Sequence, residues 1–223
     1  MRSPQILTIL GMLGVGLGFG SVVLSDRPAI PFAQSIDASL YAQTPASPDA
    51  TESEEPLNAP YVPTPQIVVD RMLEMATVGS DDVVYDLGSG DGRLVITAAK
   101  NYGARGVGIE INSRLIEQSN ANAQAAGVAD RVEFRQEDLF QADFSDATVV
   151  TLYLLPEVNL QLRPLLLEQL RPGTQIVSHG FDMGDWEPEE VVTVQGPNRL
   201  HIIYRWTVPE EIPEYLRQSP SSQ

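Results

Sequence analysis

Between residues 61 and 208, short apolar runs alternate with longer segments in which apolar residues recur every three or four positions. The short runs predict β-strands over residues 83–87, 106–111, 131–135, 148–155 and 175–179. The longer segments predict helices over residues 92–102, 113–127 and 157–171, and Gly127 is a natural helix end. Strands and helices that alternate at this spacing predict a doubly wound, parallel α/β sheet covered on both faces.

The two ends of this domain follow different patterns. Thr64 followed by Pro65 predicts a capped helix start, and the helix carries one apolar stripe of Ile67, Val68, Met72, Leu73 and Met75. The last two apolar runs, 191–194 and 200–208, are separated only by a turn that contains Gly196-Pro197-Asn198. This spacing predicts an antiparallel hairpin rather than a further crossover. The predicted fold is therefore a seven-stranded, mostly parallel sheet with a C-terminal antiparallel hairpin.

The chain outside this domain is predicted to have three further parts. Residues 6–24 are uncharged and follow Arg2; at about 1.5 Å per residue, a helix of this length nearly spans the ~30 Å core of a bilayer. Residues 1–25 are therefore expected to be a signal peptide or a membrane anchor, because five glycines would weaken a buried core helix. Residues 26–60 are rich in Pro, Ala and Ser and predict a disordered tether, and residues 209–223 predict a polar tail.

The composition of the chain argues against several kinds of partner and catalytic site. Thirty acidic residues stand against 14 Lys and Arg, for a net charge of −16, which argues against a nucleic-acid partner because phosphate backbones are repelled. The absence of cysteine excludes disulfides, thiolate zinc sites and a cysteine nucleophile. With His179 and His201 as the two histidines of the chain, no metal site is predicted.

The most informative motif follows the first predicted strand. Residues 86–93 read D-L-G-S-G-D-G-R, so the chain leaves a strand, turns through glycines and enters a helix. This is the place where doubly wound folds bind nucleotides, because glycine lets a ligand approach the backbone closely. The spacing G-x-G-x-G differs from the dinucleotide pattern G-x-G-x-x-G, and Asp86 would repel a pyrophosphate. Both features disfavour a nicotinamide-dependent oxidoreductase and favour a cationic or zwitterionic ligand.

Two further acids follow the next strands. Glu110 ends the second predicted strand and is suited to accept from both hydroxyls of a ribose. Asp138 follows the third strand and is suited to accept from an adenine amino group, with Leu139 and Phe140 covering the base. The combination predicts a nucleoside-containing ligand.

With these motifs, residues 61–208 resemble the class I S-adenosylmethionine-dependent methyltransferases. The pair Pro60-Tyr61-Val62-Pro63 and D-L-G-S-G-D-G-R is similar to the protein-lysine methyltransferases that act on the mitochondrial ADP/ATP carrier and the ATP synthase c-subunit. The resemblance implies a Rossmann-like fold and S-adenosylmethionine as cofactor. It implies that Tyr61 and Pro63 close over the cofactor, that Asp86 and Gly88 hold its amino-acid end and that Glu110 holds its ribose. The predicted cofactor-binding set is Tyr61, Pro63, Asp86, Gly88, Ser89, Gly90, Glu110, Asp138 and Leu139.

The methyl acceptor is harder to predict. After the fourth strand the chain reads Leu154-Leu155-Pro156, whereas methyltransferases of base or amide nitrogens often carry an Asp/Asn-Pro-Pro-aromatic tetrad there. Tyr153, His179 and Asp182 are candidates for a catalytic role, each with a structural alternative, and none is assigned. The acids between Asp182 and Glu190 either attract a cationic side chain or form a solvated loop.

The leading hypothesis is an N-methyltransferase that modifies lysine in a protein, and the alternative is a non-catalytic S-adenosylmethionine-binding sensor module. A membrane-embedded substrate would lie near an uncleaved N-terminal anchor. The expected localisation is membrane-associated or exported. Arg2 favours export of the domain, whereas the cofactor is made in the cytoplasm, so the side of the membrane stays open.

Overall fold

A computed structural model describes residues 61–217. The predicted N-terminal segment 1–25, the tether 26–60 and residues 218–223 of the tail lie outside the described residues. None of the helices between residues 61 and 217 is long and apolar enough to cross a bilayer.

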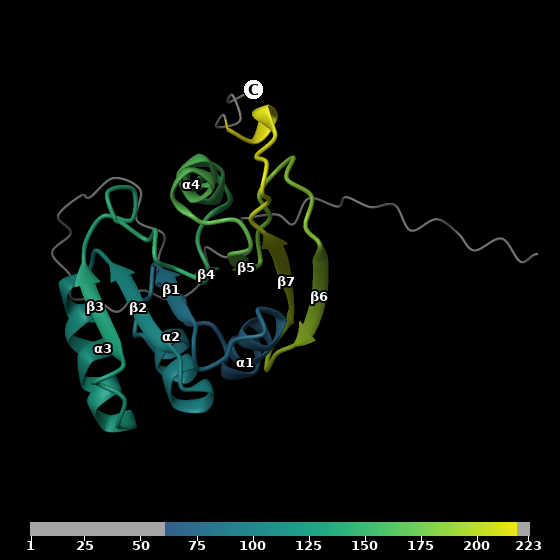
Figure 1. Cartoon of the computed structure of the whole chain (residues 1–223). Helices are drawn as coiled ribbons and strands as arrows, with labels where there is room; N and C mark the ends of the chain where they lie inside the picture. The colour runs from purple at the N-terminus through teal and green to yellow at the C-terminus, as the bar shows by residue number, and fades with distance from the viewer. Residues whose placement is uncertain (1–60, 218–223) are drawn as a thin grey trace, which may run out of the picture. The chain divides into compact units, whose positions relative to one another are not determined.

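The strands of the described domain form one seven-stranded sheet in the order β3-β2-β1-β4-β5-β7-β6 (Figure 1). The neighbouring pairs among β1 to β5 are parallel, while β7 runs antiparallel to both β5 and β6. The predicted fold class and hairpin are therefore confirmed. The strands are β1 Val83–Leu87, β2 Arg105–Glu110, β3 Val132–Gln136, β4 Val149–Leu152, β5 Gln175–His179, β6 Glu190–Gln195 and β7 Leu200–Thr207.

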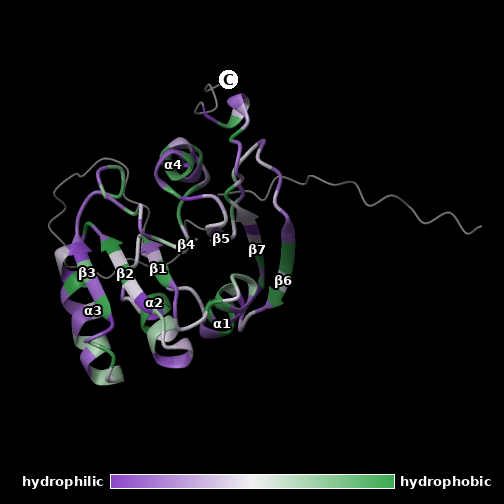
Figure 2. Ribbon diagram, in the orientation of Figure 1, coloured by the Kyte–Doolittle hydropathy of each residue, from purple (hydrophilic) through white to green (hydrophobic). Residues whose placement is uncertain are grey.

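The helices cover the sheet unequally. They are α1 Gln66–Met75, α2 Arg93–Thr97, α3 Ser113–Ala126 and α4 Pro156–Gln169, with a π-helical turn η2 Ala98–Tyr102 and a short 3-10 turn η3 Glu214–Leu216. Helices α1, α2 and α3 lie on one side of the sheet and α4 on the other (Figure 1). Loop residues Phe144, Met183 and Trp186 complete the cover on the α4 side. Along α3 and α4, hydrophobic and hydrophilic residues alternate, as expected for helices with one buried face (Figure 2).

Side-chain alternation along the strands builds the two halves of the core. In β1, Val84 packs with α1 and α2, whereas Tyr85 and Leu87 pack in the cluster that contains α4. The same alternation separates Val149 from Val150 in β4, because neighbouring strand residues point to opposite faces. Two packed faces hold β1 and β4 in place, and these central strands carry the candidate site.

The predicted start of α1 is wrong in two details. Pro65 is the N-cap, and no side chain caps the helix; the Thr64 hydroxyl instead lies 3.3 Å from Nδ1 of His179. Ile67 is 52% exposed, whereas Val69 is fully buried. Tertiary packing explains both differences, because the buried side of α1 is rotated toward Val69 and the Thr64 side chain is drawn into the sheet.

Candidate active site

A cavity of about 290 Å³ opens at the carboxyl ends of the central strands. It lies where the strand order changes direction between β1 and β4, the place where open α/β sheets bind ligands. All nine residues of the predicted cofactor-binding set line this cavity: Tyr61, Pro63, Asp86, Gly88, Ser89, Gly90, Glu110, Asp138 and Leu139. The structure thus brings them together, while the contact that each makes with a cofactor stays a prediction.

The glycine loop between β1 and α2 is held against β2. The backbone N–H groups of Gly88 and Ser89 both donate to the carbonyl of Ile109, each at 2.9 Å. Gly90 has φ +54, and a Cβ atom there would lie 2.4 Å from the ring of Tyr61. Glycine is therefore required at position 90 both by the backbone angle and by the close approach of Tyr61.

Glu110 connects the loop to the start of α3. Its Oε2 accepts from the N–H of Gly90 at 3.0 Å and its Oε1 accepts from the N–H of Asn112 at 2.9 Å. A carboxylate oxygen accepts more than one hydrogen bond, so these contacts orient Glu110 while leaving it acceptor capacity. This geometry suits the predicted ribose contact.

Asp138 organises its own turn. Its Oδ1 accepts from the N–H of Phe140 at 2.9 Å, and the carboxylate is exposed at the cavity wall. Leu139 and Phe140 both line the cavity beside it. An apolar surface next to a carboxylate is the arrangement that an adenine ring with an amino group would fill.

Asp86 is a buried carboxyl at the bottom of the site. Thr151 donates to its Oδ1 from 2.7 Å. Burial is the main cause that raises the pKa of Asp86 to about 7, nearby Glu110 and Asp91 add to the rise, and the Thr151 hydrogen bond opposes it. A ligand ammonium would favour the ionised form, so this carboxyl is suited to a zwitterionic ligand.

Residues 61–65, which we call the strap, are tied to the loop by Arg93. The guanidinium donates from Nε to Oδ1 of Asp91 at 2.9 Å, from Nη2 to Oδ2 of Asp91 at 2.6 Å, and from Nη1 to the carbonyl of Thr64 at 2.8 Å. Burial alone would raise the pKa of Asp91, but its bonds to Arg93 outweigh burial and lower it. The ion pair therefore fixes one wall of the cavity.

The cavity fits S-adenosylmethionine by the chemistry of its groups. Three carboxylates are placed for an ammonium, a ribose and an adenine, and Arg93, the cation in the lining, is paired with Asp91. The hydroxyl of Ser89 is buried beside Gly108 and has no hydrogen-bond partner among residues 61–217. The donor set suits an adenosyl sulfonium rather than a diphosphate.

The three candidates for a catalytic role lie in different environments. Tyr153, just after β4, lines the cavity, and its hydroxyl accepts from Nη2 of Arg199 at 3.0 Å. His179, at the end of β5, is 1% exposed and lies behind the cavity lining. The exposed Asp182 accepts from the N–H of Gly184 at 3.0 Å and does not line the cavity.

Some residues of the site could not be singled out from the sequence. Thr64, Asp91 and Arg93 line the cavity, and His201 contacts His179. The two-residue spacing of Asp91 and Arg93 indicates a local ion pair, but the contact of Arg93 with Thr64 joins residues far apart in sequence. In the sequence, His201 has the pattern of an ordinary residue of the hairpin.

A doubly wound sheet with this loop and these acids defines the class I S-adenosylmethionine-dependent methyltransferases. The sequence model of the ANTKMT methyltransferase domain matches residues 86–190. A protein-lysine N-methyltransferase of Saccharolobus islandicus is 47% identical over 154 residues, which cover 69% of this chain and 96% of that protein. The chain therefore belongs to the ANTKMT-like family of S-adenosylmethionine-dependent methyltransferases and is an enzyme of this type.

Two further relatives extend the comparison. The human lysine N-methyltransferase of the ATP synthase c-subunit is 32% identical over 146 residues; the match covers 66% of this chain and 62% of that protein, less than two thirds of its length. The crystal structure of an RNA methyltransferase from Salinibacter ruber in complex with S-adenosyl-L-homocysteine is 64% identical, covers 70% of this chain and all of that chain, and has a TM-score of 0.67. The cofactor prediction is confirmed, and these relatives give no support to a sensor module or a nicotinamide enzyme.

Proposed function

We propose that the enzyme transfers a methyl group from S-adenosylmethionine to the ε-amino group of lysine in a protein. The observation that carries the proposal is the 47% identity over nearly the whole length of a relative named protein-lysine N-methyltransferase. The net charge of −16 supports it, because an acidic protein attracts a lysine-bearing substrate.

The chemistry asks little of individual side chains. The methyl group of a sulfonium is already activated, so catalysis rests mainly on aligning the acceptor nitrogen and excluding water. The strap and the turn at Leu139 and Phe140 border the cavity and are suited to exclude water. A lysine ammonium would first have to give its proton to water. Its nitrogen would then form a bond to the methyl carbon as the carbon–sulfur bond breaks, and the electron pair of that bond would stay on the sulfur.

RNA is the competing acceptor, because the Salinibacter ruber relative is described as an RNA methyltransferase. Against RNA stand the 14 basic residues opposed by 30 acidic ones, since RNA binding depends on neutralising phosphates with Lys and Arg. Leu154-Leu155-Pro156-Glu157 after β4 also lacks the amide and aromatic groups expected for a base acceptor.

The test separates the two acceptors in one reaction. Purified full-length protein is incubated with methyl-labelled S-adenosylmethionine and a bacterial lysate, and aliquots are then treated with protease or with ribonuclease. We expect the labelled material to be degraded by protease and to resist ribonuclease. Acid hydrolysis of this material should yield labelled methyllysine. The Glu110→Ala variant, whose cofactor site is damaged, is the background control. Label in RNA would overturn the proposal, and absence of transfer to every fraction would favour a non-catalytic binding role.

We further propose that the N-terminal segment attaches the enzyme to a membrane. The uncharged residues 6–24 support this proposal, and a substrate in the same membrane would then lie within reach. Cell fractionation of full-length protein and of a variant starting at residue 26 tests it: we expect the full chain in the membrane fraction and the shorter one in the soluble fraction. A reporter fused after residue 223 identifies the side. Full-length protein in the soluble fraction would contradict attachment.

A further inference from the structure

Behind the part of the cavity lined by Thr64 and Tyr153 lies a chain of buried polar groups. Thr64 Oγ1 is 3.3 Å from Nδ1 of His179, and Nε2 of His179 is 2.8 Å from Nδ1 of His201. The exposed fractions of these residues are 8%, 1% and 6%, so the chain is shielded from water. Its members come from the strap, from the end of β5 and from β7.

The imidazole ring of His179 also supports Tyr153. The rings of Tyr153 and His179 are stacked with centroids 3.8 Å apart and an interplanar angle of 29°. Thr64 and Tyr153 both line the cavity, and both contact His179. His179 itself does not line the cavity. His179 is thus a shared support for two cavity residues that are distant in sequence.

The hairpin completes this support from the sheet edge. Arg199, in the turn between β6 and β7, donates to the hydroxyl of Tyr153, and His201 follows two residues later. Gly196 leaves room for the His201 ring, since a Cβ atom there would lie 2.5 Å from it. Because of these contacts, the antiparallel hairpin supports the Tyr153 wall of the cavity although it lies at the edge of the sheet.

We propose that the Thr64–His179–His201 chain is a positioning device that holds Tyr153 and the strap where the acceptor nitrogen enters the cavity. The proposal rests on the methyltransferase function proposed above and names the part of the fold that orients its acceptor. His179 is a positioning residue, because it acts through Thr64 and Tyr153 rather than by touching substrate.

All the hydrogen bonds of this chain can form while both histidines are uncharged. In a neutral pair one ring nitrogen donates and its partner accepts, and the remaining nitrogen of His179 can pair with the Thr64 hydroxyl in either direction. The groups that face His179 are His201 and Arg199 from the hairpin, Tyr153 just after β4, and Thr64 of the strap. Burial, followed by His201 and Arg199, lowers the pKa of His179 to about 3. Burial, followed by Arg199, also lowers the pKa of His201, so both rings favour the neutral form at physiological pH.

The kinetic test uses Thr64→Val, which removes the hydroxyl but keeps the shape, and Thr64→Ser, which restores it. We expect Thr64→Val to lower kcat about tenfold and Thr64→Ser to recover most of it. The Kd for S-adenosylhomocysteine should change less than threefold, because Arg93 still binds the backbone carbonyl of residue 64 in both variants. The matched control is Thr174→Val, which removes a buried hydrogen bond to the carbonyl of Ala147 at the opposite end of β5. The control is expected to keep wild-type kcat.

The outcome that would overturn the proposal is a Thr64→Val enzyme with wild-type kcat, or one whose cofactor affinity falls together with kcat. The acceptor in this assay is whichever molecule the wild type methylates, so a wrong proposal about lysine leaves this test intact. A second measurement needs no acceptor and no variant: ¹⁵N NMR of the imidazoles between pH 5.5 and 9. We expect the His179 shifts to stay those of a neutral ring, and titration in this range would contradict a neutral chain.

Discussion

At the scale of single residues, Asp86 is a functional group whose burial in its ionised form destabilises the folded state. A carboxyl whose pKa rises from its ordinary value to about 7 on folding binds protons more readily in the folded than in the unfolded state. Its contribution to stability therefore decreases as pH rises from about 4 to 7. Such a residue in the cavity is better explained by a cationic ligand than by packing.

The first prediction concerns the pH dependence of cofactor affinity. Because a ligand ammonium prefers the ionised carboxylate, we expect the affinity for S-adenosylmethionine to rise with pH up to about 7 and then to level off until the ligand's own amino group loses its proton. Below pH 7 the affinity should decrease by up to about tenfold for each pH unit. Calorimetric titration from pH 5.5 to 8.5 measures it, with Asp86→Asn as the variant that binds weakly and without this dependence. Equal pH dependence in both proteins would show that another group is responsible.

Glu110 provides the second prediction. Replacement by Ala removes the two backbone hydrogen bonds and the predicted ribose acceptor, and hydrogen bonds to charged groups are worth about 1.5–3 kcal/mol. We expect Glu110→Ala to weaken binding of S-adenosylhomocysteine at least tenfold by calorimetry. Glu110→Gln, which keeps one acceptor oxygen, should lie between Ala and wild type. Unchanged affinity in Glu110→Ala would remove Glu110 from the cofactor site.

At the scale of elements, the sequence predicted what depends on local pattern. Residues 83–87 and 175–179 were predicted without error as β1 and β5, because buried parallel strands are short apolar runs bounded by turns. The end of α3 at Gly127 is also predictable, because glycine readily adopts the left-handed conformation that it has at this helix end. The sequence could also place Asp86, Glu110 and Asp138 together, since parallel strands end at the same edge of a sheet.

Other features of the site depend on contacts between distant segments. The break of the predicted helix 92–102 into α2 and the π-helical turn η2 leaves no mark in the apolar spacing. The misplaced cap of α1 has a similar origin, because the Thr64 hydroxyl has a tertiary partner in His179. His201 lies next to His179 because β7 pairs with β5, and this pairing is known only from the three-dimensional structure.

The third prediction concerns the strap, which Arg93 ties to the glycine loop. Lys in place of Arg93 keeps the positive charge but cannot bridge both oxygens of Asp91 and the carbonyl of Thr64. We expect Arg93→Lys to weaken cofactor binding about tenfold and to speed amide hydrogen exchange at Tyr61, Val62 and Thr64. Calorimetry and exchange mass spectrometry measure the two effects. Wild-type exchange in the strap would show that other contacts hold it.

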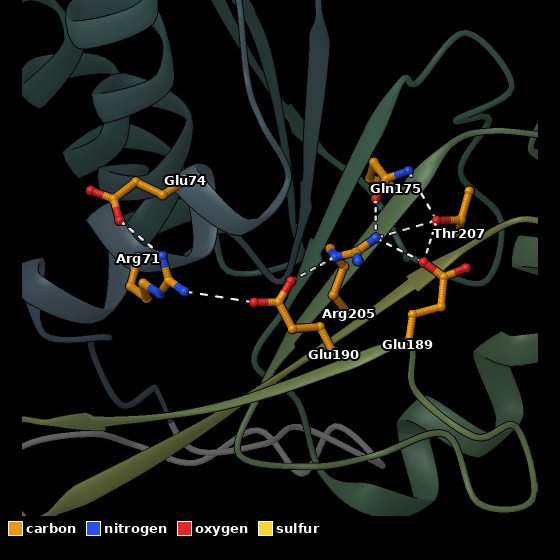
Figure 3. A network of polar contacts seen from close by, with 7 residues as sticks. All are labelled: Arg71, Glu74, Gln175, Glu189, Glu190, Arg205 and Thr207. Atoms are coloured by element: carbon orange, nitrogen blue, oxygen red, sulfur yellow. Dashed lines mark hydrogen bonds and ion pairs between the residues drawn. The ribbon is translucent and has the colours of Figure 1, made fainter. Parts of the chain in front are cut away.

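At the scale of the whole domain, the hairpin must be fixed to the parallel part of the sheet. Arg205 of β7 donates to Glu189 at 2.8 Å, to Glu190 at 3.3 Å and to the Gln175 side chain of β5 at 2.9 Å (Figure 3). Glu190 is also paired with Arg71 of α1 at 3.6 Å (Figure 3). This network joins β6, β7, β5 and α1, and its side of the sheet carries the residues that support Tyr153.

The last prediction is that this network stabilises the domain more than an isolated surface pair does. Arg205 is 20% exposed and has several partners, so we expect Arg205→Met to lower the free energy of unfolding by about 1–2 kcal/mol and Tm by about 4 °C. The matched control is Arg217→Met, which removes the same charge from an exposed pair with Glu214 at 3.5 Å and should cost at most about 0.5 kcal/mol. Thermal unfolding at low salt and at 1 M salt compares them, and the difference should narrow at high salt because part of it is electrostatic. Equal Tm values for both variants would mean that backbone pairing with β5 and apolar contacts hold the hairpin, in which case Arg199 and His201 would keep their positions without the network.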